Sequence, residues 1–521
     1  MILEKTKNTK RNIVWGCLNK VINIIFPFII RTIIIYGLGV EYIGLNSLFS
    51  SVLGVLSLAE LGFDSAVVYI MYSAIANDDY KQIGALQLYL KRTYFIIGII
   101  ILSVGIVIMP LLPDLIKDSS DVPSEINIYT LYLCFLLNTV VSYFFGGYKQ
   151  GLFRAYQRVD IISNVDTVCT ILSTMFQAMG LLIFHSFYSY VLISISFTCV
   201  RNVLMVKKSQ KYYGYIQEIG TIDKDTKKKI RKVIWGTMYN KIGGTLTSTF
   251  DDLVCSKYLG IVILGLFSNY KYICNAVLGF LVVIYNSMIA GIGNNVALKS
   301  SEENRKDLEL FTFIFNWICG WCMYCLIYLF QPFIDIWIGE KGLLPNIVML
   351  SIALYFYSII FNSMICIYKE AAGIYWEDRF RGLIGGIINL ILNICIVKIL
   401  IPYGELYALM GLVLSTVVTQ LLVTVPWAIN ITFKIYFKSS AKTYYRIIIK
   451  SLINILIAAI VSYPVFNHIP MGSGNFKIIY FFFKMIICVF LPNAVLVLLY
   501  WRDPKLKMSM NYIFSRVKSV K

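Results

Sequence analysis

The residues of this 521-residue chain that are best suited to chemistry are charged side chains inside long apolar runs. The run at 13–36 carries Lys20 and Arg31, which at 100° per residue lie about 20° apart on one helix face, with Pro27 between them. A cation at the centre of a membrane span costs about 2.5–3.5 kcal/mol on insertion scales. Pro27 removes a backbone hydrogen bond and should bend the helix. We therefore expect this face to line a watery cavity rather than lipid.

A second run, at 233–256, is the least apolar of all. Its notable residues are Lys241, Gly243, Gly244, Asp251 and Asp252. The adjacent glycines should weaken the helix locally and allow it to bend, and the two acids should face the same cavity.

Among the further charges inside apolar runs, Glu60 and Asp64, one helical turn apart, and Lys271 are candidates for a function. In a cleft of low dielectric, a carboxylate gains proton affinity and can exchange a proton or bind Na⁺. Glu60, Asp64, Asp251 and Asp252 are therefore candidates for ion coupling. The simpler alternative is that Glu60 and Asp64 cap or pair with groups at a span end, and Lys271 can equally be structural.

Membrane-spanning helices must position these residues, because 58% of the chain is hydrophobic and only 14% is charged, against about 25% charged in soluble domains. The apolar runs are continuous rather than alternating, which favours helices over a barrel. Fourteen runs are long enough to cross: 13–36, 46–72, 91–112, 128–148, 161–184, 187–206, 233–256, 262–290, 309–331, 346–368, 382–401, 405–429, 447–466 and 477–500.

The basic residues fix the expected orientation. With the N-terminus in the cytoplasm, 35 of the 47 Lys and Arg residues fall in inner segments and five in outer loops. Both termini are therefore predicted to be cytoplasmic. The net charge of +19 then reflects topology, and no nucleic-acid partner is expected.

The sequence also indicates an internal duplication with an offset of about 221 residues. Gly39 aligns with Gly260 and Gly44 with Gly265, and two further stretches follow the same shift. Such a parallel repeat is found in transporters whose site lies between two lobes. The predicted organisation is an N-terminal lobe of six helices, a basic cytoplasmic linker, a second six-helix lobe, and a C-terminal helical hairpin with a basic tail: 1–206, 207–232, 233–430 and 431–521.

Several kinds of site are missing from the sequence. It has no Gly-rich phosphate loop, and its 12 Cys and 2 His residues show no metal-ligand spacing. The outer loops are too short to hold a catalytic site. We therefore expect a secondary transporter rather than an enzyme, without a cofactor or metal beyond a coupling H⁺ or Na⁺.

Four stretches carry a resemblance to a known family: LGVEYIGLNSLFSSVLGVLSLAELGFDSA (38–66), QGLFRAYQRVD (150–160), FIDIWIGE (333–340) and AAGIYWEDRFRGLIGGIINLILN (371–393). In these the chain resembles the multidrug/oligosaccharidyl-lipid/polysaccharide exporter superfamily, which is MATE-like, and within it the bacterial Wzx-type polysaccharide repeat-unit flippases.

This resemblance implies a monomer of the bacterial cytoplasmic membrane that moves undecaprenyl-pyrophosphate-linked oligosaccharide to the outer leaflet by alternating access, for O-antigen, capsule or exopolysaccharide export. The implied partners are membrane lipid, the lipid-linked substrate, and a polysaccharide polymerase and glycosyltransferases. Lys20, Arg31, Lys241 and Lys271 would be the cavity cations that hold the pyrophosphate. The alternatives are a MATE-type drug/cation antiporter, a peptidoglycan lipid-precursor flippase and, less compatible with the short loops, a membrane enzyme of glycan assembly.

Overall fold

The computed structural model describes residues 5–60, 62–469 and 476–519, and every regular element in these ranges is a helix. The all-α polytopic fold class predicted from the sequence is therefore confirmed. By its internal contacts the chain divides into two compact units, Met1–Gly265 and Leu266–Lys521. The lobe and linker boundaries drawn from the repeat stay a prediction.

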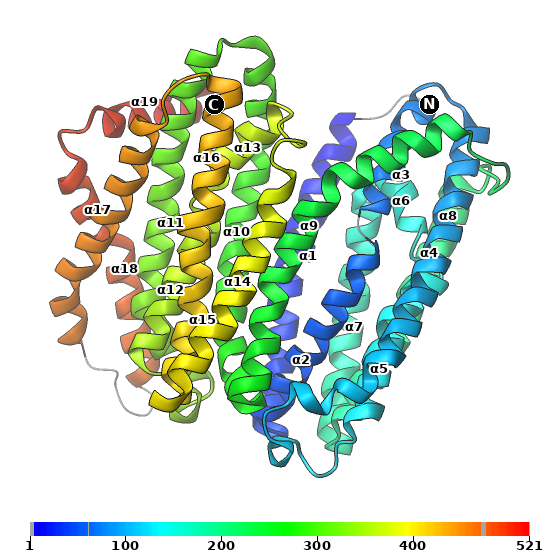
Figure 1. The fold of residues 1–521 in the computed structure, drawn as a ribbon, viewed down its shortest axis with the longest axis horizontal. Coiled ribbons are helices and arrows are strands. Elements are labelled where there is room, and N and C mark those ends of the chain that lie inside the picture. The colour runs from blue at the N-terminus through cyan, green and yellow to red at the C-terminus, as the bar shows by residue number, and fades with distance from the viewer. Residues whose placement is uncertain (1–4, 61, 470–475, 520–521) are drawn as a thin grey trace. The chain divides into compact units, whose positions relative to one another are not determined.

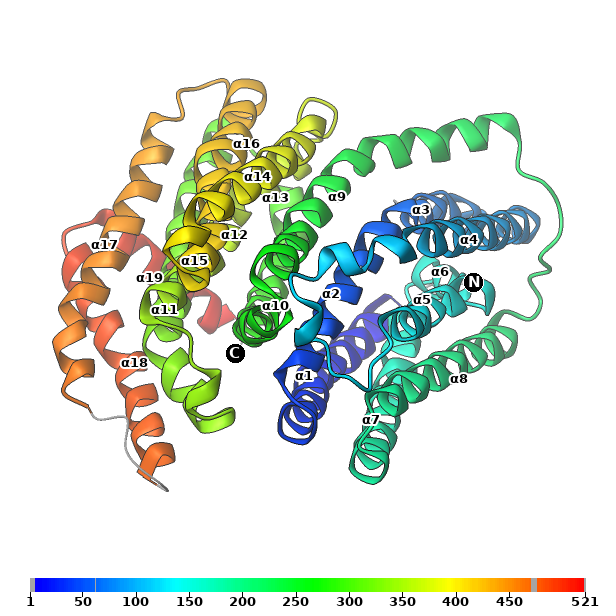
Figure 2. The ribbon, with the colours of Figure 1, turned by 60° about the horizontal axis from the view of Figure 1, so that its bottom comes forward.

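The first unit is a bundle of long helices joined by short connections (Figure 1). Its α-helices are α1 (Lys5–Gly37), α2 (Val40–Leu56), α3 (Phe63–Ala76), α4 (Tyr80–Ile108), α5 (Ile128–Phe144), α6 (Lys149–Ala155), α7 (Val159–Phe184), α8 (Phe187–Tyr213), α9 (Lys224–Leu259) and the start of α10 (Ile261–Leu298). α1 packs along α7, α7 on α8, and α9 against α2 and α3 (Figure 2).

Two spans of this unit are interrupted. The turn of 3-10 helix η1 (Ser57–Glu60) and Gly62, which has φ +77°, separate α2 from α3. α5 and α6 meet at an angle of 56°. Both breaks expose backbone and side-chain groups inside the bundle, where an unbroken helix would satisfy its own hydrogen bonds.

The glycine pairs found in the sequence occupy equivalent places. Gly39, with φ +135°, ends the link from α1 to α2, and Gly260, with φ +99°, ends the link from α9 to α10. A Cβ at Gly44 would overlap the carbonyl oxygen of Ile261, and a Cβ at Gly265 would overlap that of Val40. The starts of α2 and α10 therefore cross at a distance that only glycine permits.

The second unit repeats the pattern of α2–α8 from α10 onward and then adds a hairpin. Its remaining elements are α11 (Ser301–Trp337), α12 (Asn346–Ile360), α13 (Ser363–Ala371), α14 (Arg379–Leu400), α15 (Glu405–Thr419), the π-helical segments η7 (Gln420–Thr424) and η8 (Phe433–Phe437) around α16 (Val425–Thr432), α17 (Lys442–Asn467), α18 (Phe476–Tyr500) and α19 (Pro504–Ser519). The hairpin helices α17 and α18 both pack on α11 (Figure 2).

Ion pairs fix the matching turns of the two units. Before α14, the fully buried Asp378 pairs with Lys369, and its two oxygens accept hydrogen bonds from Arg381 Nε at 2.9 and 3.0 Å. Before α7, Arg158 pairs with Asp160 at 2.9 Å. The turn in the second unit therefore buries both members of its Lys369–Asp378 pair, whereas in the first the buried Asp160 pairs with an arginine that is 21% exposed.

Twelve helices in the described ranges are long and apolar enough to cross a membrane, or thirteen if the bent α5–α6 pair is one span, against the fourteen predicted. The predicted span 233–256 lies within α9, which has 36 residues and so has the length to cross. α9 is absent from the twelve because its Lys, Asp, Gly and Thr residues lower its hydropathy.

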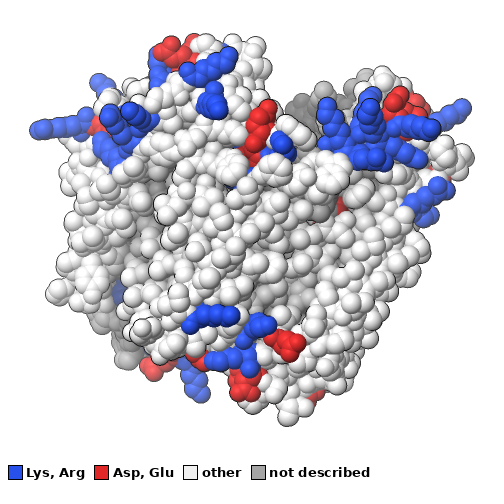
Figure 3. Space-filling model, in the orientation of Figure 1, with Lys and Arg blue, Asp and Glu red and all other residues white. Residues whose placement is uncertain are grey.

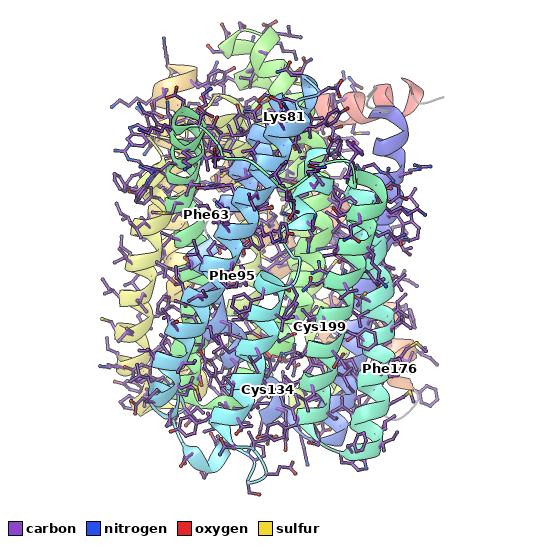
Figure 4. The ribbon with its side chains drawn as sticks, turned by 90° about the vertical axis from the view of Figure 1, so that its right-hand side faces the viewer. Phe63, Lys81, Phe95, Cys134, Phe176 and Cys199 are labelled. Atoms are coloured by element: carbon purple, nitrogen blue, oxygen red, sulfur yellow. The ribbon has the colours of Figure 1, made fainter. Side chains whose placement is uncertain are left out.

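The surface supports a membrane location. On the face of each unit that Figure 3 shows, charged side chains gather at the two ends and leave a wide uncharged band between them. Large apolar side chains are exposed within the band, among them Phe95 of α4 and Phe176 of α7, which points away from the bundle (Figure 4). Such a surface suits the hydrocarbon of a bilayer.

Candidate functional site

A polar cavity of about 540 Å³ opens within the first unit, where the break between α2 and α3 faces α6 and α9. Its charged lining residues are Glu60, Asp64 and Arg154, and most of its other lining residues are serine, threonine or glycine. The 3-10 turn η1 contributes Ser57, Leu58 and Glu60 to its lining.

Glu60 ends η1 and receives hydrogen bonds from two tyrosines. Tyr143 of α5 donates to its Oε2 at 2.7 Å, and Tyr94 of α4 donates to its Oε1 at 3.1 Å. The two rings pack with centroids 5.6 Å apart. The two phenol groups donate hydrogen bonds to separate oxygens of Glu60 and so orient its carboxyl group without adding a charge to the site.

Asp64 lies in the first turn of α3 and forms an ion pair with Arg154 of α6. The carboxylate is buried, whereas 42% of the Arg154 side chain is exposed. Arg154 also donates to Gln150 Oε1 at 3.2 Å. A guanidinium has five donors, so Arg154 can bind an anion in the cavity while it stays paired with Asp64.

Two glycines make room for this arrangement. A Cβ at Gly151 would lie 3.0 Å from Asp64 Oδ1 and 2.9 Å from Leu90 Cδ2, so a larger residue there would have to displace both side chains. Gly244 of α9 lines the opposite wall with open space beside it. The site therefore combines two carboxylates and one guanidinium in a cavity roomy enough for a polar group.

The predicted cations of α1 lie elsewhere. Lys20 and Arg31 are both half-buried in α1, and this helix packs along α7. Asn19, the residue before Lys20, donates hydrogen bonds to α7 at 3.2 and 3.3 Å. Arg31 lies within electrostatic range of Tyr190 in α8. Pro27 sits inside α1, which continues through it. The structure does not bring the two cations to the Glu60–Arg154 cavity, and their predicted role in binding stays a prediction.

The predicted acids of α9 also lie apart from the cavity. Asp251 is buried, and Asp252 accepts a hydrogen bond from Ser51 Oγ of α2 at 3.0 Å. The α9 helix is unbroken through the buried Gly243 and visibly curved (Figure 1). The side chain of Lys241 lies outside the part of the chain that the structure describes.

Lys271 belongs to the second unit. It is half-buried in α10, with its Nζ 5.3 Å from the centre of the Phe267 ring. This cation–π contact is compatible with a structural role as well as with the predicted binding role.

Sequence reasoning missed Arg154 and the two tyrosines of the site. Arg154 lies in the stretch 150–160 that carries the family resemblance, and that was the signal available for it. Tyr94 and Tyr143 gave no signal, because the chain has 37 tyrosines.

Comparisons with known proteins agree with this architecture. A model of the polysaccharide biosynthesis protein family matches residues 9–289. A search of curated protein sequences finds no match.

Solved structures share the fold at low identity. The lipid II flippase MurJ, in an inward closed conformation, superposes with a TM-score of 0.63 at 14% identity, over 94% of this chain and 99% of that one. An inward-facing multidrug resistance MATE family transporter of the MOP superfamily superposes with a TM-score of 0.59 at 13% identity, over 80% of this chain and 96% of that one. A mutant of the MATE transporter VcmN of Vibrio cholerae superposes with a TM-score of 0.55 at 13% identity, over 83% of this chain and 99% of that one. The family match covers more than half of the sequence, and the fold is that of these transporters and flippases, so the chain belongs to the polysaccharide biosynthesis protein family.

Proposed function

We propose that this protein is a flippase that moves undecaprenyl-pyrophosphate-linked oligosaccharide from the cytoplasmic to the outer leaflet of a bacterial cytoplasmic membrane. The family match carries this proposal. A transporter fold in a family of polysaccharide biosynthesis suits this step, because sugar units assembled on a lipid at the cytoplasmic face must cross the membrane to reach the cell surface.

The physical problem is the head group. An oligosaccharide cannot cross about 30 Å of hydrocarbon without losing its hydrogen bonds to water. A polar cavity supplies substitute partners while the lipid tail stays in the bilayer. The cavity between η1, α6 and α9 offers hydroxyl groups, two carboxylates and an arginine, all of which bind sugar hydroxyls or phosphate.

The Asp64–Arg154 pair gives the proposal a route to ion coupling. While Asp64 is charged, it competes with the substrate phosphate for Arg154. When Asp64 takes up a proton, or when Na⁺ binds between Asp64 and Glu60, Arg154 is released to hold the phosphate. Substrate binding and ion binding then favour each other, so this route couples movement of the ion and the substrate in the same direction.

The experiment is transport of a fluorescent lipid-linked oligosaccharide in vesicles that contain the purified protein, with and without a proton or sodium gradient. We expect Asp64→Asn to retain transport and lose the stimulation by the gradient, because the neutral amide mimics the protonated acid. Arg154→Gln should abolish transport. Asp166→Asn is the matched control, because Asp166 pairs with Arg201 at 2.5 Å in the same unit, away from the cavity.

Gradient stimulation that persists in Asp64→Asn and in Glu60→Gln would contradict the coupling route. Transport unaffected by Arg154→Gln would contradict the binding site.

One observation favours a second candidate, a drug/cation antiporter. The cavity holds more carboxylates than cations, and two tyrosine rings lie against Glu60. Binding assays separate the two, because a flippase should bind lipid pyrophosphates and an antiporter should bind organic cations. A peptidoglycan-precursor flippase is distinguished by genetics, since its loss would be lethal rather than limited to surface polysaccharide.

A further inference from the structure

A second cavity of the first unit, of about 700 Å³, lies beside the polar one and has different chemistry. Lys227 and Arg231 of α9 provide its only charges among the lining residues, and the rest of the lining is apolar or aromatic, including Phe63, Tyr89 and Trp235. Leu58 of η1 lines both cavities. The pocket therefore joins a cationic edge to an apolar floor.

The cationic edge lacks a counter-ion within the described part of the protein. Lys227 and Arg231 are exposed, stand one turn apart on the same face of α9, and form no ion pair with another described residue. No acid is among the residues that line the pocket. Two such cations attract an external anion, and Arg231 suits a phosphate because its guanidinium binds two oxygens at once.

The apolar lining of the pocket favours an anion that also carries a hydrophobic part. Inorganic phosphate would leave Phe63 and Trp235 against water, and 46% of Trp235 is exposed. Tryptophan and tyrosine are typical of the level at which lipid head groups meet the hydrocarbon. Figure 3 shows lysines and arginines gathered over the start of α9, so a negatively charged membrane surface is attracted there.

We propose that this pocket binds an anionic phospholipid of the surrounding membrane, with its head-group phosphate on Lys227 and Arg231 and its glycerol and first acyl carbons against Phe63 and Trp235. The lipid bridges α9 to η1 and so stabilises the wall that the pocket shares with the Glu60–Arg154 cavity. This binding does not depend on what the protein transports.

The test is native mass spectrometry of the purified full chain, titrated with phosphatidylglycerol and, separately, with phosphatidylcholine. The variant is Lys227→Gln with Arg231→Gln. The matched control, Lys229→Gln with Lys232→Gln, removes the same charge from exposed positions more than about 90° around α9 from the pocket face.

We expect phosphatidylglycerol to bind the wild type more tightly than phosphatidylcholine does. The pocket variant should bind phosphatidylglycerol about thirty-fold more weakly, which is about 2 kcal/mol at 1.4 kcal/mol per tenfold, from two contacts near the membrane surface. The control should stay within a few-fold of the wild type.

An equal loss in both variants would overturn the proposal in favour of general attraction to the basic segment. Equal binding of the two phospholipids would overturn it as well. Displacement by inorganic phosphate would make the pocket a simple anion site, and displacement by undecaprenyl pyrophosphate at lower concentrations than by phosphatidylglycerol would assign the pocket to a transport substrate. If the pocket variant and the control variant unfold at the same temperature, misfolding is excluded as the cause of weaker lipid binding.

Discussion

Replacing Asp378 by Asn is expected to destabilise the protein strongly, because it leaves a buried cation without its counter-charge. Asp378 is fully buried, and Lys369, its partner, is 3% exposed at the side chain. Removing one member of a buried ion pair costs about 3–5 kcal/mol, most of it the penalty of the remaining unpaired charge.

The corresponding turn of the first unit provides the control. Asp160 pairs with Arg158, whose side chain is 21% exposed and can turn to water when its partner is lost. The cost of Asp160→Asn is then only that of hydrogen bonds to a charged group, about 1.5–3 kcal/mol. A third variant, Lys369→Met with Asp378→Asn, removes both buried charges and should recover much of the stability.

Thermal unfolding of the detergent-purified protein, followed by fluorescence-detected size exclusion, ranks these variants. The reasoning predicts that Asp378→Asn is the least stable, and that Asp160→Asn and the double variant are both closer to the wild type. If Asp160→Asn is the most damaging, or if Lys369→Met fails to rescue Asp378→Asn, the buried charge is not the source of the effect.

Two further predictions concern the first unit. Gly44→Ala should destabilise it by about 1–3 kcal/mol through overpacking, whereas Gly16→Ala, which meets no atom within 4 Å, should be neutral or stabilising in the same unfolding assay; equal effects would refute the close crossing. Burial alone would raise the pKa of Glu218, but the hydrogen bond and charge of Lys149, at 2.6 Å, lower it below its ordinary 4.5. The stability that Glu218 adds is therefore present above about pH 4.5 and lost as the pH falls through the lowered pKa, so Glu218→Gln should be less stable than the wild type at pH 7 and equal to it in strong acid; a constant difference would contradict this.

The fold was largely predictable because its determinants are local or periodic. Apolar runs give the helices, and the offset of 221 residues that recurs along the chain picks out Gly44 and Gly265 as a pair. The predicted span at α9 does not meet the criterion of hydropathy, although the helix is long enough to cross, because its polar residues lower its mean hydropathy.

The candidate site was predictable only in part. Glu60 and Asp64 stood out because acids inside apolar runs are costly. Arg154 did not, because its meaning depends on α6 packing against α3, and the two residues of that ion pair are 90 positions apart in sequence. The tyrosines on Glu60 come from two further helices, and the spacing along one chain cannot show which of many rings converge on one carboxylate.

The crossing of α2 and α10 restricts which residues the chain can carry there. Each glycine leaves space for the other helix's carbonyl oxygen, so a side chain added at either position would push both helices apart. A substitution at one position therefore cannot be offset by the residue at the other. The requirement at Gly44 and Gly265 is steric and independent of any chemistry that the cavity performs.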